Sequence, residues 1–157
     1  ILQKTFEIDE NDNYKTLLEK SYEECPKLLL ESIKMIKSRN FKRIPQIEIS
    51  DKYMYCSKRV EGDEIINWDN SSRDLFNFIR ALSYPGPCAQ TFAKNLPVKI
   101  INSNIIENAP KYLGIPGTVL ESCGDGFLVK TKDSFIKITE WESPINIFTG
   151  LRFSQKG

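Results

Sequence analysis

The stretch that decides the fold is residues 74–87, DLFNFIRALSYPGP. Its apolar residues recur at steps of three and four, which is typical of a helix that buries one face: Leu75, Phe76, Ile79 and Leu82. Asn70, Ser71 or Ser72 can cap this helix, and the prolines that follow end it, because proline lacks the backbone N–H that a helix needs. We therefore predict a helix from about residue 71 to residue 82, followed by a turn.

Five short segments rich in β-branched and aromatic residues follow this helix, and turn signals separate them. They are residues 88–92, 98–106, 117–122, 126–131 and 134–141. Such a series of short strands is typical of a small barrel, here a partly open one. For residues 144–153 we predict a last helical turn that covers the barrel or returns to a larger domain.

Upstream of the decisive stretch the pattern is mixed. Residues 1–8 alternate imperfectly between apolar and polar side chains, which predicts a strand. Residues 14–38 predict a helix that is kinked or divided at Pro26. Residues 44–66 are interpreted as an extended connector with short strands. The apolar stripe of the predicted helix consists of Leu18, Tyr22, Cys25, Leu29, Ile33 and Ile36.

The composition is that of a globular protein. Of the 157 residues, 40% are hydrophobic and 27% are charged. No apolar run reaches the roughly 18 residues of a membrane helix, and the first residues do not resemble a secretory signal. We therefore expect a cytoplasmic location.

Charge and cysteine usage exclude two kinds of site. The chain has 22 basic and 21 acidic residues, so it lacks the excess of positive charge that is typical of nucleic-acid binders. The four cysteines form no CxxC pair, and the sequence contains no histidine that could complete a zinc site. We expect reduced, mostly buried thiols at Cys25, Cys56, Cys88 and Cys123, and no metal.

Several short motifs occur in a fixed order along the chain. They are Ile1-Leu2-Gln3, Pro45-Gln46, Lys58-Arg59, Asp63, Ile66, Trp68, Phe78-Ile79-Arg80-Ala81-Leu82, Tyr84-Pro85-Gly86, Pro116-Gly117-Thr118-Val119 and Gly124-Asp125-Gly126. This ordered set resembles the second half of the folate-dependent formyltransferases, a family that includes methionyl-tRNA formyltransferases and nucleotide-amino-sugar N-formyltransferases. Glu64, Asn67 and Pro87-Cys88 depart from the family's pattern.

The resemblance implies an α+β fold in three parts. Residues 1–50 would be the tail of a Rossmann-like formyltransferase domain, consisting of a strand and a helix. Residues 51–87 would form a connector and a helix, and residues 88–157 would form a small C-terminal OB-like β-barrel.

The resemblance also implies a reaction whose centre lies outside this chain. Members of the family transfer a formyl group from 10-formyltetrahydrofolate to an amine, and their N-terminal domain supplies an Asn, a His and an Asp. Ile1-Leu2-Gln3 matches a position just beyond that Asp. We therefore expect no catalytic residue and no folate bound by this chain alone, with the N-terminal catalytic domain as its missing partner. Asp9 and Asp12 are interpreted as turn and cap residues.

Four residues are candidates for substrate binding. Lys58 and Arg59 lie on the connector, which would face the mouth of the cleft in the family, and a guanidinium suits a bidentate hold on phosphate. A solvated pair balanced by neighbouring acids is the alternative. Arg80 could contact substrate or bridge two elements. Tyr84 could stack on a base or a sugar, or close the core as a turn aromatic.

Near-neutral charge and the lack of an evident basic and aromatic face favour a nucleotide-linked amino sugar over tRNA, whose binding depends on phosphate neutralisation. The first alternative is the C-terminal part of a methionyl-tRNA formyltransferase. The second is a non-catalytic module that binds or forms a homodimer. The charge also counts against an independent oligonucleotide-binding barrel. Neither a membrane nor a nucleic acid is expected as a partner.

Overall fold

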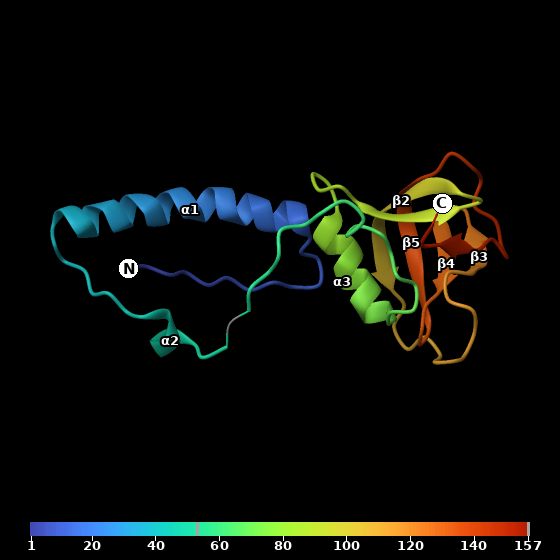
Figure 1. Ribbon diagram of the computed structural model, residues 1–157, viewed down its shortest axis with the longest axis horizontal. Helices are drawn as coiled ribbons and strands as arrows, with labels where there is room; N and C mark the ends of the chain where they lie inside the picture. The colour runs from blue at the N-terminus through green and yellow to red at the C-terminus, as the bar shows by residue number, and fades with distance from the viewer. Residues whose placement is uncertain (53, 157) are drawn as a thin grey trace. The chain divides into compact units, whose positions relative to one another are not determined.

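The computed structural model describes residues 1–52 and 54–156 (Figure 1). Its internal contacts divide the chain into a first unit, residues 1–12 and 16–60, and a barrel unit, residues 13–15 and 61–157. The first unit contains most of helix α1 and all of α2, and the barrel unit contains helix α3 and the sheet. Among the described residues, no helix combines the length and the apolar composition needed to cross a bilayer.

In the described part of the barrel unit, six strands form one antiparallel sheet with the order β3-β4-β5-β2-β1-β6. Five of them lie close to the segments predicted from β-branched alternation. Between β1 and β2, Lys94 and Asn95 have φ values of 51° and 65°, as a two-residue hairpin turn requires. The strands are β1 (Ala89–Ala93), β2 (Leu96–Ile105), β3 (Val119–Cys123), β4 (Gly126–Lys130), β5 (Phe135–Glu142) and β6 (Phe153–Ser154).

The prediction of a helical turn over residues 144–153 is wrong. These residues run as an irregular loop into β6, where Ala93 pairs with Phe153 and Phe92 pairs with Ser154. Leu151 and Phe153 are buried while Arg152 between them is exposed. Burial of every second residue is typical of a strand. The segment is extended because the edge of the sheet offers hydrogen-bond partners to its backbone.

The sheet curls until backbone groups from its two edges meet. The N–H of Phe153 donates to the carbonyl of Gly117 (2.9 Å), and the N–H of Val119 donates to the carbonyl of Leu151 (2.8 Å). The N–H of Gly150 completes the set by donating to the carbonyl of Val119 (2.8 Å). These bonds satisfy polar groups that an open edge would expose. The curled antiparallel sheet agrees with the predicted partly open barrel, while its OB-like character stays a prediction.

Helix α3 (Ser72–Leu82) packs its apolar stripe on the sheet, as predicted. Leu75 and Ile79 are fully buried in the same cluster as Ile100 of β2. The hydroxyl of Ser71 caps the helix by accepting from the N–H of Asp74 (3.1 Å). Aromatic rings fill the centre of the core: Trp68 stacks on Phe153 with 5.5 Å between ring centroids, and Phe127 meets Trp141 edge-on at 4.9 Å.

The first unit contains most of α1 (Tyr14–Lys37) and all of α2 (Gln46–Ile49) (Figure 1). Helix α1 confirms the predicted helix and continues through Pro26, yet none of its residues, all of which the structure describes, is buried. Its predicted stripe is exposed to solvent on this chain at Tyr22, Leu29, Ile33 and Ile36.

Two predictions for the first unit are wrong. None of residues 1–8, all of which the structure describes, lies in a strand, because no neighbouring strand offers them backbone partners. In the predicted connector, residues 46–49 form the short helix α2. The interpretation of Asp9 as a turn residue is confirmed, since Asp9 accepts from the N–H of Asn11 (2.7 Å). Asp12 accepts from the hydroxyl of Thr16 (2.8 Å) and pairs with Nζ of Lys20 (2.7 Å), and its role as a cap stays a prediction.

We predict that Leu75→Ala lowers the free energy of unfolding of the barrel unit by about 2–5 kcal/mol, because its side chain is fully buried and its loss leaves a cavity. Leu29→Ala removes the same atoms from a side chain that is 61% exposed on α1, and it should change that free energy by about 0.5 kcal/mol or less. Urea unfolding followed by tryptophan fluorescence measures both, and equal losses would contradict the packing described for α3.

Candidate functional site

The four binding residues proposed from the sequence belong to different units. Lys58 and Arg59 lie in the first unit, where both are exposed and outside helices and strands. Arg80 and Tyr84 lie in the barrel unit, at the end of α3 and in the loop after it. A binding site shared by all four residues therefore stays a prediction.

Arg80 is held beside its own helix. Its Nε donates to Oδ1 of Asn77 (3.1 Å), and its guanidinium carbon lies 5.2 Å from the centroid of the Phe76 ring. The side chain is partly exposed. These contacts with its own helix orient the guanidinium, which suits it to a positioned polar contact.

Tyr84 does not close the core, because its side chain is 46% exposed. Its hydroxyl donates to Oε1 of Glu142 (2.9 Å), and Oε2 of Glu142 lies 3.4 Å from Nζ of Lys99. The hydrogen bond to Glu142 raises the pKa of the Tyr84 hydroxyl, since the carboxylate favours the protonated phenol. The ring is therefore fixed at its polar end and open to a ligand at its side.

Arg80 and Tyr84 line one hollow of about 210 Å³ on the barrel unit. The β-bulge of β2 near Asn102 lies at this hollow, and the side chain of Glu140 from β5 faces it as well. The hollow thus offers donors and acceptors together, an arrangement that suits a hydroxyl or an amine better than a multiply charged anion. Its lining is completed by Asn13, Lys15, Ser83 and Ile101.

Within residues 1–52 and 54–156, no three side chains of Cys, Asp or Glu gather in a way that could hold a metal ion. All four cysteines are free thiols, as expected, but Cys25 and Cys56 are exposed rather than buried. Burial raises the pKa of the Cys88 thiol, which keeps it protonated and weakly nucleophilic.

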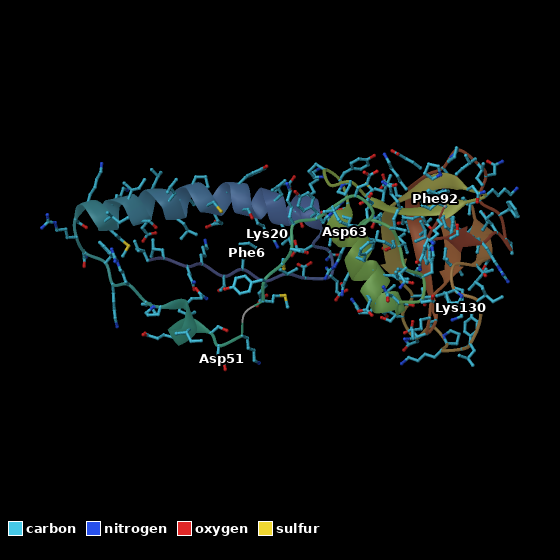
Figure 2. The ribbon with its side chains drawn as sticks, in the orientation of Figure 1. Phe6, Lys20, Asp51, Asp63, Phe92 and Lys130 are labelled. Atoms are coloured by element: carbon cyan, nitrogen blue, oxygen red, sulfur yellow. The ribbon has the colours of Figure 1, made fainter. Side chains whose placement is uncertain are left out.

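A basic and aromatic surface lies on the outside of β1 and β6. Nζ of Lys94 lies 5.2 Å from the ring centroid of Phe148, whose side chain is 46% exposed. Because Ala93 pairs with Phe153, Lys94 and Arg152 are the next residues along the two strands, and both are exposed. Phe92, labelled in Figure 2, lies two residues before Lys94, and its side chain is partly exposed on β1. We call Phe92, Lys94, Phe148 and Arg152 the β1–β6 patch.

The electrostatics of the β1–β6 patch favour an anion. In the part of the chain that the structure describes, neither Lys94 nor Arg152 forms an ion pair with a carboxylate. Two such cations beside half-exposed aromatic rings can neutralise phosphates while the rings stack on bases. No face of this kind is evident in the sequence, because the helical turn predicted for residues 144–153 would separate Phe148 and Arg152 from β1.

We predict that Glu142→Gln lowers the pKa of the Tyr84 hydroxyl toward its ordinary value near 10.0, because the amide no longer repels the phenolate. A pKa raised in the folded state gives stability that is present below the unfolded pKa and is lost as the pH rises through the folded pKa. The variant should therefore lose less stability than the parent above about pH 10. NMR titration of labelled tyrosine measures the shift, with Glu140→Gln as the weaker control, and an unmoved Tyr84 titration in Glu142→Gln would argue against the contact.

Residues 60–146 match the family described as "Formyl transferase, C-terminal domain". Among curated proteins, the methionyl-tRNA formyltransferase of Mycoplasma mycoides subsp. mycoides is 36% identical over 145 residues, which cover 88% of this chain and 43% of the relative. The methionyl-tRNA formyltransferase of Thermodesulfovibrio yellowstonii is 31% identical over 138 residues, covering 88% of this chain and 42% of the relative. The chain thus spans less than half the length of these relatives.

Solved structures share the fold. A substituted variant of HypX from Aquifex aeolicus aligns with a TM-score of 0.50 at 20% sequence identity, covering 74% of this chain and 20% of HypX. HypX in complex with tetrahydrofolic acid aligns with a TM-score of 0.50 at 19% identity and the same coverage. At this level of identity the likeness concerns the fold alone.

Proposed function

Because the chain belongs to the formyl transferase C-terminal domain family, we propose that it is the C-terminal part of an enzyme that transfers a formyl group to methionyl-tRNA. The observation that carries this proposal is the identity of 36% and 31% to proteins named methionyl-tRNA formyltransferase, each over 88% of the chain. Since the chain corresponds to only 43% and 42% of those relatives, the reaction is proposed for the longer protein.

The amino-sugar substrate expected from the sequence gains no support. It depended on a near-neutral net charge and on the lack of a basic and aromatic face. Net charge does not decide binding when two cations without carboxylate partners lie together, as Lys94 and Arg152 do on the β1–β6 patch. The relatives' names and the patch together favour tRNA, and the patch is the proposed contact for it.

The reaction is assigned to the part of the protein outside this chain. Formyl transfer to an amine needs a general base for the amine proton and donors for the developing oxyanion, and this chain contains no histidine. When bound, 10-formyltetrahydrofolate supplies the formyl group, and the binding of tetrahydrofolic acid by HypX supports a folate carrier. The residues of this chain bind and orient the RNA instead.

The first unit is proposed to pack against the catalytic part of the same polypeptide. An amphipathic helix that exposes Tyr22, Leu29 and Ile33 on its own chain has apolar surface that a neighbouring domain would cover. Residues 1–50 would then complete the Rossmann-like domain, residues 51–87 would connect it, and residues 88–157 would form the OB-like barrel. On this arrangement Lys58, Arg59, Arg80 and Tyr84 are secondary contacts to the RNA.

The decisive experiment uses the longer protein that contains this chain. Transfer of the formyl group from 10-formyltetrahydrofolate is measured with methionyl-tRNA and, in parallel, with a nucleotide-linked amino sugar. We expect formylated methionyl-tRNA and no formylated sugar. Transfer to the sugar alone would restore the first interpretation, and transfer to neither would favour the non-catalytic module.

We predict that Lys94→Ala combined with Arg152→Ala weakens tRNA binding by the 157-residue chain and reduces the slope of log K against log[salt] by about 2, because two phosphate contacts are lost. Lys99→Ala is the matched control, since its ammonium already lies beside Glu142 (3.4 Å). Fluorescence anisotropy over a salt series measures both. An unchanged slope in the double variant would exclude the β1–β6 patch as the phosphate contact.

A further inference from the structure

Lys130 is a buried lysine that neither the β1–β6 patch nor the hollow beside Arg80 uses. It lies at the end of β4, and only 1% of its surface is exposed (labelled in Figure 2). Its Nζ donates to the carbonyls of Thr131 (2.7 Å) and Ser134 (3.0 Å) and lies 4.4 Å from the ring centroid of Tyr112. The two carbonyls and the aromatic ring offset the cost of burying the ammonium. The role of Lys130 therefore lies in the segments that carry these partners.

The partners of Lys130 join two segments that are far apart in the sequence. Residues 106–118, which we call the covering loop, connect β2 to β3 and pass over the turn between β4 and β5. The N–H of Tyr112 donates to the carbonyl of Asp133 (3.1 Å), and the hydroxyl of Ser134 donates to the carbonyl of Pro110 (2.8 Å). The covering loop is therefore joined to the turn by these two hydrogen bonds, and the ammonium adds its contact with the Tyr112 ring.

Gly114 shows how closely the covering loop approaches Lys130. A Cβ placed at Gly114 would lie 2.8 Å from Cε of Lys130. The loop thus packs directly on the methylene groups of Lys130, while the ammonium of this residue contacts the Tyr112 ring. Burial lowers the pKa of Lys130, and the nearby carboxylate of Asp133 opposes that shift.

The covering loop ends in the segment that closes the barrel. The N–H of Gly117 donates to the carbonyl of Lys130 (2.8 Å), and the N–H of Lys130 donates to the carbonyl of Thr118 (2.9 Å). On its other side the same segment bonds to residues 150–153, through Gly117 to Phe153 (2.9 Å). Residues 150–153 include Arg152 and directly follow Phe148 and Thr149. A continuous set of bonds therefore runs from Lys130 to the β1–β6 patch.

We propose that Lys130 is a positioning residue for RNA binding: its buried ammonium pins the covering loop to the β4–β5 turn and thereby holds residues 117–119 where they fix the β1–β6 patch. The RNA part of this inference rests on the proposed function. The pin itself rests on the contact of Nζ with the Tyr112 ring and on the close approach of Gly114 to the lysine stem. The hydrogen bonds of Nζ to Thr131 and Ser134 fix the ammonium within the β4–β5 turn. Lys130 touches no RNA on this account and acts only through the segments it holds.

The test uses the 157-residue chain with Lys130→Met, which keeps a long apolar stem and removes the ammonium. We expect amide hydrogen exchange of residues 110–119 and 148–153 to become about tenfold faster, while the amides of α3 and β2 keep their protection. Affinity for tRNA should fall, and its salt slope should decrease by about 1 although both patch cations remain. A merely structural role would not change that slope.

Two further variants keep the inference testable if Lys130→Met folds poorly. Tyr112→Leu removes the ring from a side chain that is 39% exposed, and it should speed exchange of the same amides to a smaller extent. Lys137→Met makes the same chemical change on β5, where the ammonium pairs with Asp125 at the surface (2.6 Å), and it should leave both the exchange and the tRNA affinity unchanged.

The outcomes separate the two proposals. If the unaltered chain does not bind tRNA, the proposed function fails, and the exchange experiment still decides whether Lys130 pins the covering loop. If the unaltered chain binds tRNA and Lys130→Met binds it with the same affinity and salt slope, only the positioning role is overturned. Unchanged exchange at residues 110–119 in both Lys130→Met and Tyr112→Leu would overturn the pin.

Discussion

The closure of the sheet between residues 117–119 and 150–153 is the constraint on which the rest of the barrel unit depends. Three backbone hydrogen bonds of 2.8–2.9 Å join the two edges, and they place the Phe153 ring against Trp68 in the core. Gly117 makes this approach feasible: its φ is 79°, and a Cβ there would lie 2.9 Å from the carbonyl oxygen of Phe153 and 3.2 Å from the Trp68 ring. A side chain at this position would therefore push the edges apart.

The sequence predicted those helices and strands that are long enough to show a pattern of apolar residues. Helix α3 was predicted because its apolar residues recur at steps of three and four. Strands β1 to β5 were predicted because turn signals separate short segments rich in β-branched and aromatic residues. Strand β6 has two residues, Phe153 and Ser154, which is too short to show a period, so its pairing with β1 could not be predicted. Residues 1–8 show the converse, since alternation without a neighbouring strand does not produce one.

The candidate site was predicted less well than the fold. Like strand β6, part of it depends on pairing between segments that are far apart in the sequence. Arg80 and Tyr84 were proposed from local motifs, and the structure places both on one hollow. Lys94, Phe148 and Arg152 were not predicted as site residues, because they come together only when β6 pairs with β1. A net charge of +1 then argued against RNA, although electrostatic attraction depends on the charges that lie together on one face.

On the proposed function, fold stability and RNA binding depend on the same closure of the sheet in the barrel unit. The segment that bears Arg152 is held by residues 117–119, and those residues are held in turn by Lys130. A change that loosens this closure would shift the β1–β6 patch without altering any charge on it. Helix α1 is different, since none of its residues is buried and its apolar side chains contribute little to the packing of the described residues. The barrel unit therefore buries its own apolar residues, whereas the first unit leaves the apolar stripe of α1 exposed, which is the surface proposed to meet another domain.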